Sequence, residues 1–214
     1  MTVETEERNV TNAMDTQSIF LAIGGDIGER CLNYLAKTGV EITDVLRRGE
    51  KFRTTPADFL ISIQYDKLFS EQDLSQYKKA YNFHFSMLPL NRGCLPINWA
   101  IWNGDPIGVT LHEMTDGIDD GCIIDKIQVQ DEVEETAYTA YKKCCKACYE
   151  LLTRNIGRLL RDDYTATPQD HSKATYHKKG EFPCDKYLDG LNKWDKERLQ
   201  RALWFPEKEG ARYR

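Results

Sequence analysis

The chain has 214 residues and a mass of 24.8 kDa, the size of one domain or of one domain with a small appendage. Hydrophobic residues make up 41% and charged residues 29%, as in ordinary globular proteins, which excludes wholesale disorder and collagen-like repeats. The net charge is −5, so the chain has no overall basic field for binding nucleic acid. No apolar run reaches the ~18–20 residues of a membrane span, and the first residues lack the basic-then-apolar order of a signal peptide. We therefore expect a soluble cytoplasmic protein that binds no nucleic acid and does not span a membrane.

The first predicted elements form a β-α-β unit. Residues 1–16 are acidic and polar and are expected to form a flexible tail. An apolar strand at 18–23 is followed by a helix at 29–38 and a strand at 40–46, which predicts a parallel pair of strands. The intervening glycines are spaced G-G-x-x-G, unlike the dinucleotide-binding G-x-G-x-x-G pattern, and we assign them to a tight turn.

The rest of the chain continues the alternation of strands and helices. Strands are predicted at 58–63, 80–85, 108–114 and 122–129, and helices at 70–79, 98–102 and 136–160. This order predicts an α/β fold with an open, mostly parallel sheet.

The last stretch has a different composition. Residues 171–214 hold eleven Lys and Arg against seven Asp and Glu, inside an acidic protein. A hairpin is predicted at 175–182 around Gly180, and a short helix at 193–203. We divide the chain into a tail at 1–16, a catalytic domain at 17–164 and an appendage at 165–214 that packs on the main domain or on a partner subunit.

Seven cysteines are present, and three of them cluster at Cys144, Cys145 and Cys148. The cluster lies in a predicted helix, but no second Cys/His pair follows at zinc-finger spacing. We interpret these residues as small apolar side chains facing a core, and we expect reduced thiols and no metal site.

The strand at 80–85 carries the first candidate catalytic residues. Asn82 and His84 are two positions apart in an extended segment, so their side chains project to the same face. The acidic, glycine-flanked loop at 116–121 can bring a carboxylate to His84. An amide for a developing oxyanion, an imidazole for proton transfer and a carboxylate beside it suit acyl transfer to an amine. No nucleophile is evident, which favours direct transfer.

Several ordered motifs resemble the formyltransferase family, whose members use 10-formyltetrahydrofolate. They are Asn82-Phe-His84-Phe-Ser86-Met-Leu-Pro89, Arg92-Gly93, Pro96-x-Asn98-Trp99-Ala-Ile, Gly108-Val-Thr-Leu-His112 and Gly117-Ile-Asp119-Asp-Gly121. The resemblance spans most of residues 18–163 and implies a Rossmann-like catalytic domain. Phe85, Met87 and Asp120 depart from the commonest family pattern, and none of these departures removes a catalytic side chain.

The resemblance implies roles for particular residues. It makes Asn82, His84 and Asp119 catalytic, with His84 as the base and Asp119 holding its tautomer. Asp119 is preferred over Asp120 on its spacing to Gly121. The folate is expected to contact Tyr65, Ser86, Met87, Leu88, Pro89, Asp116, Gly117 and Ile118. The acceptor substrate is expected to contact Arg92, Trp99, Arg201, Trp204 and Phe205, with docking of the tail as the alternative role for Trp204 and Phe205. His112 is expected to be structural or to support the site, because we place it a loop away from Asn82.

Within the family, the chain is most similar to sugar N-formyltransferases. Their typical acceptor is a dTDP-linked 4-amino-4,6-dideoxyhexose, whose product enters glycan or O-antigen synthesis. They typically pair through C-terminal elements, which implies a homodimer here. Two alternatives remain open at this point: a phosphoribosylglycinamide formyltransferase of purine synthesis, and a non-catalytic module that binds folate or a nucleotide sugar.

Overall fold

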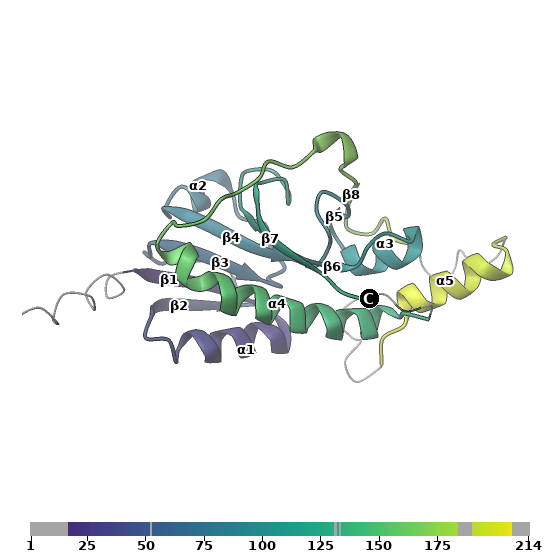
Figure 1. The fold of residues 1–214 in the computed structure, drawn as a ribbon, viewed down its shortest axis with the longest axis horizontal. Coiled ribbons are helices and arrows are strands. Elements are labelled where there is room, and N and C mark those ends of the chain that lie inside the picture. Colours follow the sequence, from purple (N-terminus) through teal and green to yellow (C-terminus); the bar gives the residue numbers. More distant parts are fainter. Residues whose placement is uncertain (1–16, 52, 131, 133, 184–189, 207–214) are drawn as a thin grey trace, which may run out of the picture. The chain divides into compact units, whose positions relative to one another are not determined.

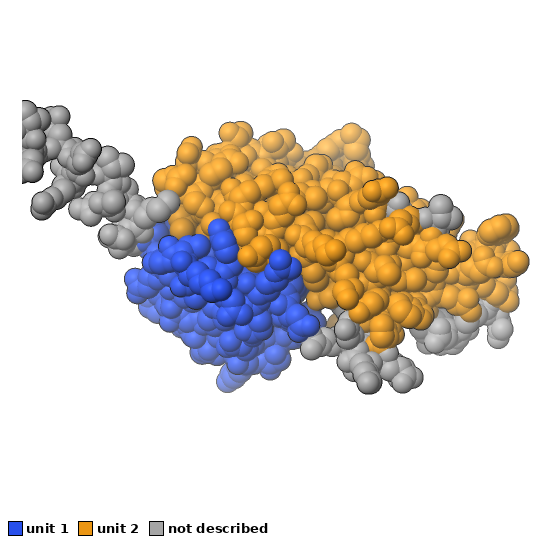
Figure 2. Space-filling view, turned by 60° about the horizontal axis from the view of Figure 1, so that its bottom comes forward, with its two compact units in different colours: residues 1–80 blue, residues 81–214 orange. Residues whose placement is uncertain are grey.

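The computed structural model describes residues 17–51, 53–130, 132, 134–183 and 190–206. The chain divides into two compact units, residues 1–80 and 81–214 (Figure 2). This division falls within the segment 17–164 that the sequence assigns to one catalytic domain, and the predicted appendage belongs to the second unit. The predicted tail at 1–16 lies outside the described residues.

The first unit contains the predicted β-α-β unit. β1 (Ser18–Ile23) pairs in parallel with both β2 (Glu41–Arg47) and β3 (Phe59–Ile63), and α1 (Gly25–Leu35) connects β1 to β2. All five residues of β3 are buried, as expected of a continuous apolar run in a parallel sheet. The helix predicted at 70–79 is shorter than expected: α2 covers only Glu71–Leu74, closed at its start by a capping box from Ser70.

The glycines after β1 have the structural role that their spacing indicates. A β-carbon on Gly24 would lie 2.1 Å from the Gln64 carbonyl oxygen, and one on Gly28 would lie 2.6 Å from the Ile23 β-carbon. Gly25 adopts φ 66°, a conformation that side chains disfavour. The turn between β1 and α1 therefore depends on small residues for its own packing.

The second unit adds antiparallel strands. β4 (Lys79–His84) pairs antiparallel with β6 (Gly108–Glu113), which pairs antiparallel with β7 (Ile123–Gln128). α3 (Pro96–Asn103) precedes β6. The predicted α/β fold is confirmed. The strand pairs of the second unit are antiparallel rather than parallel, and the loop between β6 and β7 is too short for a parallel crossover.

The long helix α4 (Ala137–Leu160) packs on β6 and β7 (Figure 1). Its first turn carries a capping box between Thr136 and Thr139. Cys144 and Cys148 are fully buried on its packed face, and burial raises the pKa of the Cys144 thiol well above its usual value. Among the described residues, no group of His, Cys, Asp or Glu is arranged to hold a metal ion.

The C-terminal segment differs from the sequence prediction in one element. The hairpin predicted at 175–182 is wrong: β8 (Tyr176–His177) pairs in parallel with β5 (Arg92–Gly93). A β-carbon on Gly93 would lie 2.3 Å from the His177 carbonyl oxygen, so glycine permits this close pairing. Long-range pairing of this kind leaves no local sequence pattern.

Two further elements complete the second unit. The 3₁₀ helix η1 (His171–Lys173) precedes β8, and α5 (Lys193–Leu203) has the predicted bounds. α5 packs against α3, where Asn98 Nδ2 donates to the Ala202 carbonyl oxygen at 2.6 Å. In the part of the chain that the structure describes, no helix is both long and apolar enough to cross a bilayer.

Candidate active site

The three predicted catalytic side chains come together in the second unit. Asn82 and His84 lie near the end of β4, and the loop after β6 brings Asp119 to them. Asn82 Nδ2 donates to Asp119 Oδ1 at 3.2 Å, and His84 Nδ1 lies 3.4 Å from Asp119 Oδ2. The structure therefore places a carboxylate of this loop beside His84.

Asp119 is held as a carboxylate. Its side chain is only 13% exposed, and burial alone would raise its pKa. The opposing effects of His84, His112 and the Gly93 amide are larger and hold the pKa well below the usual value of 3.8. The Gly93 N–H donates to Asp119 Oδ2 at 2.9 Å. A negative charge thus faces the His84 ring at neutral pH.

The tautomer of His84 is fixed from the other side of the ring. His84 Nε2 lies 2.8 Å from the Asn91 carbonyl oxygen, which can only accept a hydrogen bond. Nε2 therefore carries hydrogen, so Nδ1 presents its lone pair toward Asp119 when the ring is neutral and an N–H when the ring is protonated. The sequence analysis gave the orienting role to Asp119; the structure gives it to Asn91, a residue that the sequence analysis did not single out.

Asn91 is itself firmly held. It is fully buried at φ 57°, its N–H donates to Thr175 Oγ1 at 2.7 Å, and its side-chain amide donates to Asp105 at 3.0 Å. His177 Nε2 lies 3.1 Å from Asn91 Oδ1. The β8 region thus supports the catalytic histidine through Asn91.

His112 lies closer to the site than the sequence analysis placed it. The antiparallel register puts His112 directly opposite Asn82, and their Nε2 and Nδ2 atoms are 3.3 Å apart. His112 Nδ1 faces the Glu113 carbonyl oxygen at 2.7 Å and therefore carries hydrogen. Nε2, which also lies 3.5 Å from Asp119 Oδ1, accepts from Asn82 when the ring is neutral and donates to Asp119 when the ring is protonated. The expectation that His112 lies a loop away was wrong, because it assumed no pairing between these two strands. His112 nevertheless supports the site, as expected, by orienting the Asn82 amide.

Asp120 has a different environment from Asp119. The Asp120 carboxylate accepts a hydrogen bond from the Thr115 hydroxyl. It also packs against Gly117, where an added β-carbon would lie only 2.0 Å from Asp120 Oδ2. Asp119 therefore faces His84, while Asp120 contacts other residues of its own loop.

The residues predicted to contact folate lie in two loops and in the first unit. In the loop after β4, Ser86 and Leu88 are buried, Met87 and Pro89 are half-buried, and Ser86 Oγ donates to the Leu90 carbonyl oxygen at 2.7 Å. In the loop after β6, Asp116 is exposed while Gly117 and Ile118 are half-buried. Tyr65 belongs to the first unit, where its ring packs on Phe69 and its hydroxyl is buried without a hydrogen-bond partner among the described residues.

Two residues predicted to contact the acceptor have partners within the protein. Arg92 is 8% exposed, and its guanidinium donates to Gln169 Oε1 at 2.7 and 3.2 Å. The Trp99 ring stacks on His177 with centroids 3.9 Å apart and meets Phe182 edge-on. Gln169 was not identified from the sequence, and no motif marks it.

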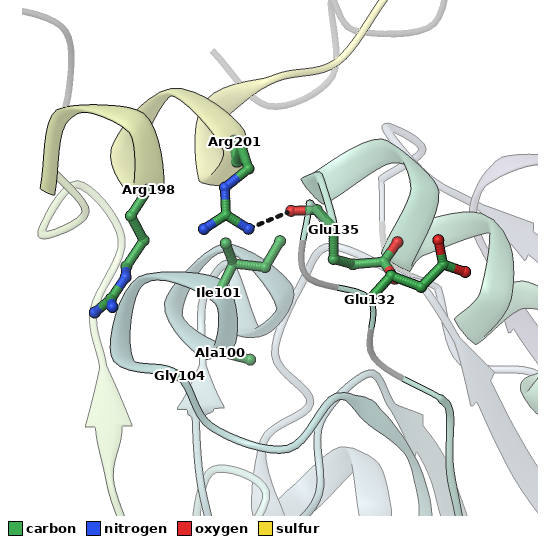
Figure 3. Close-up of a pocket in the computed structure, with 7 residues that line it drawn as sticks. All are labelled: Ala100, Ile101, Gly104, Glu132, Glu135, Arg198 and Arg201. Carbon is green, nitrogen blue, oxygen red and sulfur yellow. Dashed lines mark hydrogen bonds between the residues drawn. The ribbon is translucent and has the colours of Figure 1, made fainter. Parts of the chain in front are cut away.

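The other three candidate acceptor residues are in or just after α5. A pocket of about 340 Å³ lies between α3, α5 and the segment before α4. In this pocket Arg201 donates to the Glu135 carbonyl oxygen (Figure 3). None of Asn82, His84 and Asp119 lines this pocket. Trp204 and Phe205 pack edge-on against Tyr138 of α4, as in the docking alternative, and Trp204 remains 51% exposed.

The fold and the Asn-His-Asp cluster together define an α/β protein equipped for acyl transfer. Residues 46–156 match the family model described as Formyl transferase, which is more than half of the chain. The chain therefore belongs to the formyltransferase family of formyl-transferring enzymes, as the sequence motifs predict.

Comparison with individual proteins supports the same assignment. Bifunctional polymyxin resistance protein ArnA from Wigglesworthia glossinidia brevipalpis is 35% identical over 157 residues, 70% of this chain, and the chain spans 23% of that protein. A 4-N formyltransferase from Francisella tularensis is 21% identical with a TM-score of 0.79, over 90% of each chain. The formyltransferase PseJ from Anoxybacillus kamchatkensis, solved with UDP-4,6-dideoxy-4-formamido-L-AltNAc and tetrahydrofolate, is 25% identical with a TM-score of 0.71, over 86% of this chain and 97% of that one.

Proposed function

We propose that this protein is a sugar N-formyltransferase, which moves a formyl group from 10-formyltetrahydrofolate to the amine of a nucleotide-linked amino sugar. The observation that carries the proposal is the convergence of Asn82, His84 and Asp119 within 3.2–3.4 Å in a chain of the formyltransferase family. The complex of the similar PseJ with a formamido sugar nucleotide and tetrahydrofolate supports the choice of substrates.

The His84–Asp119 pair is built to receive a proton. Nδ1 offers a lone pair and Oδ2 a negative charge across 3.4 Å, so two acceptors face each other with no hydrogen between them when His84 is neutral. A substrate ammonium placed at this gap can give up its proton to Nδ1, and Asp119 stabilises the imidazolium that results. The amine, once deprotonated, attacks the formyl carbon.

Asn82 is the donor for the oxygen that becomes negative in the transition state. Its Nδ2 bonds to Asp119 and His112 are 3.2 and 3.3 Å long, at the weak end for N–H donors. An oxyanion is a stronger acceptor than a neutral imidazole, so we expect the hydrogen facing His112 to be redirected as charge develops. Collapse of the tetrahedral intermediate then breaks the bond between the formyl carbon and the folate nitrogen. That nitrogen takes the proton held by His84 and leaves as tetrahydrofolate, while the former amine nitrogen gives its remaining extra proton to the freed His84 and becomes the formamide.

For the acceptor, we propose a dTDP-linked 4-amino-4,6-dideoxyhexose. Arg92 and Arg201 remain candidates for its pyrophosphate, although Arg92 uses part of its guanidinium on Gln169 and Arg201 lines the pocket of Figure 3. We propose that the loops at 86–89 and 116–118 contact the folate, and the role of Tyr65 in the first unit stays a prediction from the sequence.

We also propose a homodimer formed through the C-terminal segment. Trp194 in α5 is 75% exposed, an unusual position for the largest apolar side chain, and Trp204 is half exposed beyond the end of the same helix. Contact with a second copy would cover such a surface.

The function is tested by mixing the protein with 10-formyltetrahydrofolate and a panel of amino-sugar nucleotides, with glycinamide ribonucleotide as a separate arm. Tetrahydrofolate release with a sugar nucleotide supports the proposal. Release confined to glycinamide ribonucleotide assigns the chain to purine synthesis. Folate binding without turnover of any acceptor identifies a binding module.

A further inference from the structure

Gln169 lies directly behind the catalytic loop that carries Asp119. Its side chain is 6% exposed, and its Nε2 donates to two backbone carbonyl oxygens, that of Asp119 at 2.9 Å and that of Gly121 at 2.7 Å. Both hydrogens of the amide are therefore used on one short loop. Gln169 lies outside residues 46–156, which match the family model.

The loop at 119–121 needs an external support. Asp119 adopts φ 53°, in the left-handed region that non-glycine residues rarely occupy. Such a conformation persists only where the surrounding structure holds it. The two bonds from Gln169 hold the carbonyl groups on both sides of Asp120 and so fix the direction in which the Asp119 carboxylate projects.

The orientation of the Gln169 amide is set by Arg92. Arginine only donates hydrogen bonds, and Arg92 Nε and Nη2 lie 3.2 and 2.7 Å from Gln169 Oε1. The amide oxygen must face Arg92, so the Nε2 hydrogens must face the loop. The neighbouring Gly93 donates its N–H to the Asp119 carboxylate. The Arg92–Gly93 pair therefore holds Asp119 at its carboxylate directly and at its backbone through Gln169.

We propose that Gln169 is a positioning residue of the formyl transfer, which keeps the Asp119 carboxylate facing His84 Nδ1. The proposal rests on the proposed function of Asn82, His84 and Asp119. Catalytic groups must be held to within about half an ångström of their working positions, and a misplacement of about 1 Å costs roughly 10²-fold in rate. Gln169 supplies this hold from a segment 50 residues further along the chain.

The most specific test is Gln169→Glu. This change keeps the size of the side chain and the contact with Arg92, but it replaces the donor facing two carbonyl oxygens with an acceptor. We expect kcat to fall by about 10- to 100-fold, with the dissociation constant for tetrahydrofolate within about twofold of wild type. Gln128→Glu, the same change at an exposed position of β7, is the matched control and should leave both values unchanged.

A second readout separates positioning from general stability. Loosening of the loop should speed amide hydrogen exchange at Gly93, whose N–H bonds the Asp119 carboxylate, without speeding exchange at Leu111 in β6. Gln169→Met, which fills the space without adding a charge, serves if the glutamate variant does not fold.

The values of kcat and of amide exchange at Gly93 together decide the proposal. Wild-type kcat and wild-type exchange at Gly93 in a folded Gln169 variant would overturn the proposal. Faster exchange at Gly93 together with a lower kcat supports it. If the wild-type protein transfers no formyl group, the proposed function fails, while the exchange measurement still tests whether Gln169 holds the loop.

Discussion

Replacement of His84 by asparagine tests the assignment of the base. The imidazole is 7% exposed, and His84→Asn loses the 2.8 Å bond to the Asn91 carbonyl oxygen. An unsatisfied buried carbonyl costs about 1–3 kcal/mol, so we expect a folded variant with stability lower by about that amount. Turnover should fall by roughly 10²–10⁴-fold, the usual contribution of a positioned acid or base. That loss corresponds to about 2.7–5.4 kcal/mol of transition-state stabilisation.

His112→Asn is the matched control. His112 is also buried, at 2% exposed, and bonds one backbone carbonyl oxygen, that of Glu113 at 2.7 Å. The loss of stability should therefore be similar, while the His84–Asp119 pair remains intact and the loss of turnover should be at least about tenfold smaller.

Both variants are assayed by single-turnover release of tetrahydrofolate with saturating substrates, and their stability by urea unfolding. If folded His84→Asn keeps a rate within about threefold of wild type, the role of His84 as the base is refuted. An equal loss in His112→Asn would show that the support His112 gives to Asn82 matters as much as the base.

Further predictions concern charge, packing and assembly. Asp119→Asn should lower kcat by roughly 10²-fold or more. Because the fold lowers the pKa of the Asp119 carboxyl, the carboxylate stabilises the folded state above about pH 4, and this stabilisation is lost as the pH falls below 3.8. The free energy of unfolding in urea should therefore fall less between pH 7 and pH 3 in the variant than in the wild type. Asn155→Leu removes bonds to Asp125 at 2.8 Å and to the Leu151 carbonyl oxygen at 2.9 Å, and should lower the free energy of unfolding by about 1–3 kcal/mol while leaving kcat of the folded protein unchanged. Trp194→Arg should shift the mass measured by light scattering from dimer to monomer without changing tetrahydrofolate affinity; an unchanged mass would place any dimer contact elsewhere.

The sequence predicted those features that depend on local periodicity. β1 and α5 have the expected bounds, and α4 differs by one residue. Apolar runs and helical periodicity are local features that can be read from consecutive residues. The meeting of Asn82 and His84 with the acidic loop at 116–121 could also be predicted, since the two side chains share a strand face and the loop follows another strand of the fold. The choice of Asp119 within that loop came from the family resemblance.

Features that depend on distant pairing could not be predicted. The β5–β8 pair joins segments more than 80 residues apart, and two residues in each strand give no periodic signal. The same holds for Gln169 and Asn91: a single buried amide and a single backbone carbonyl are indistinguishable in sequence from ordinary polar residues. The position of His112 beside Asn82 required the antiparallel register of β4 and β6.

We propose that the Asn82–His84–Asp119 cluster transfers a formyl group to an amino-sugar nucleotide. The most direct measurement is mass spectrometry of the acceptor after incubation with 10-formyltetrahydrofolate and dTDP- or UDP-linked 4-amino-4,6-dideoxyhexoses. We predict a mass gain of one formyl group in place of one amine hydrogen, in equal amount to the tetrahydrofolate released, with loss of both in His84→Asn. Absence of a formylated sugar nucleotide, or formylation that persists in His84→Asn, would contradict the claim.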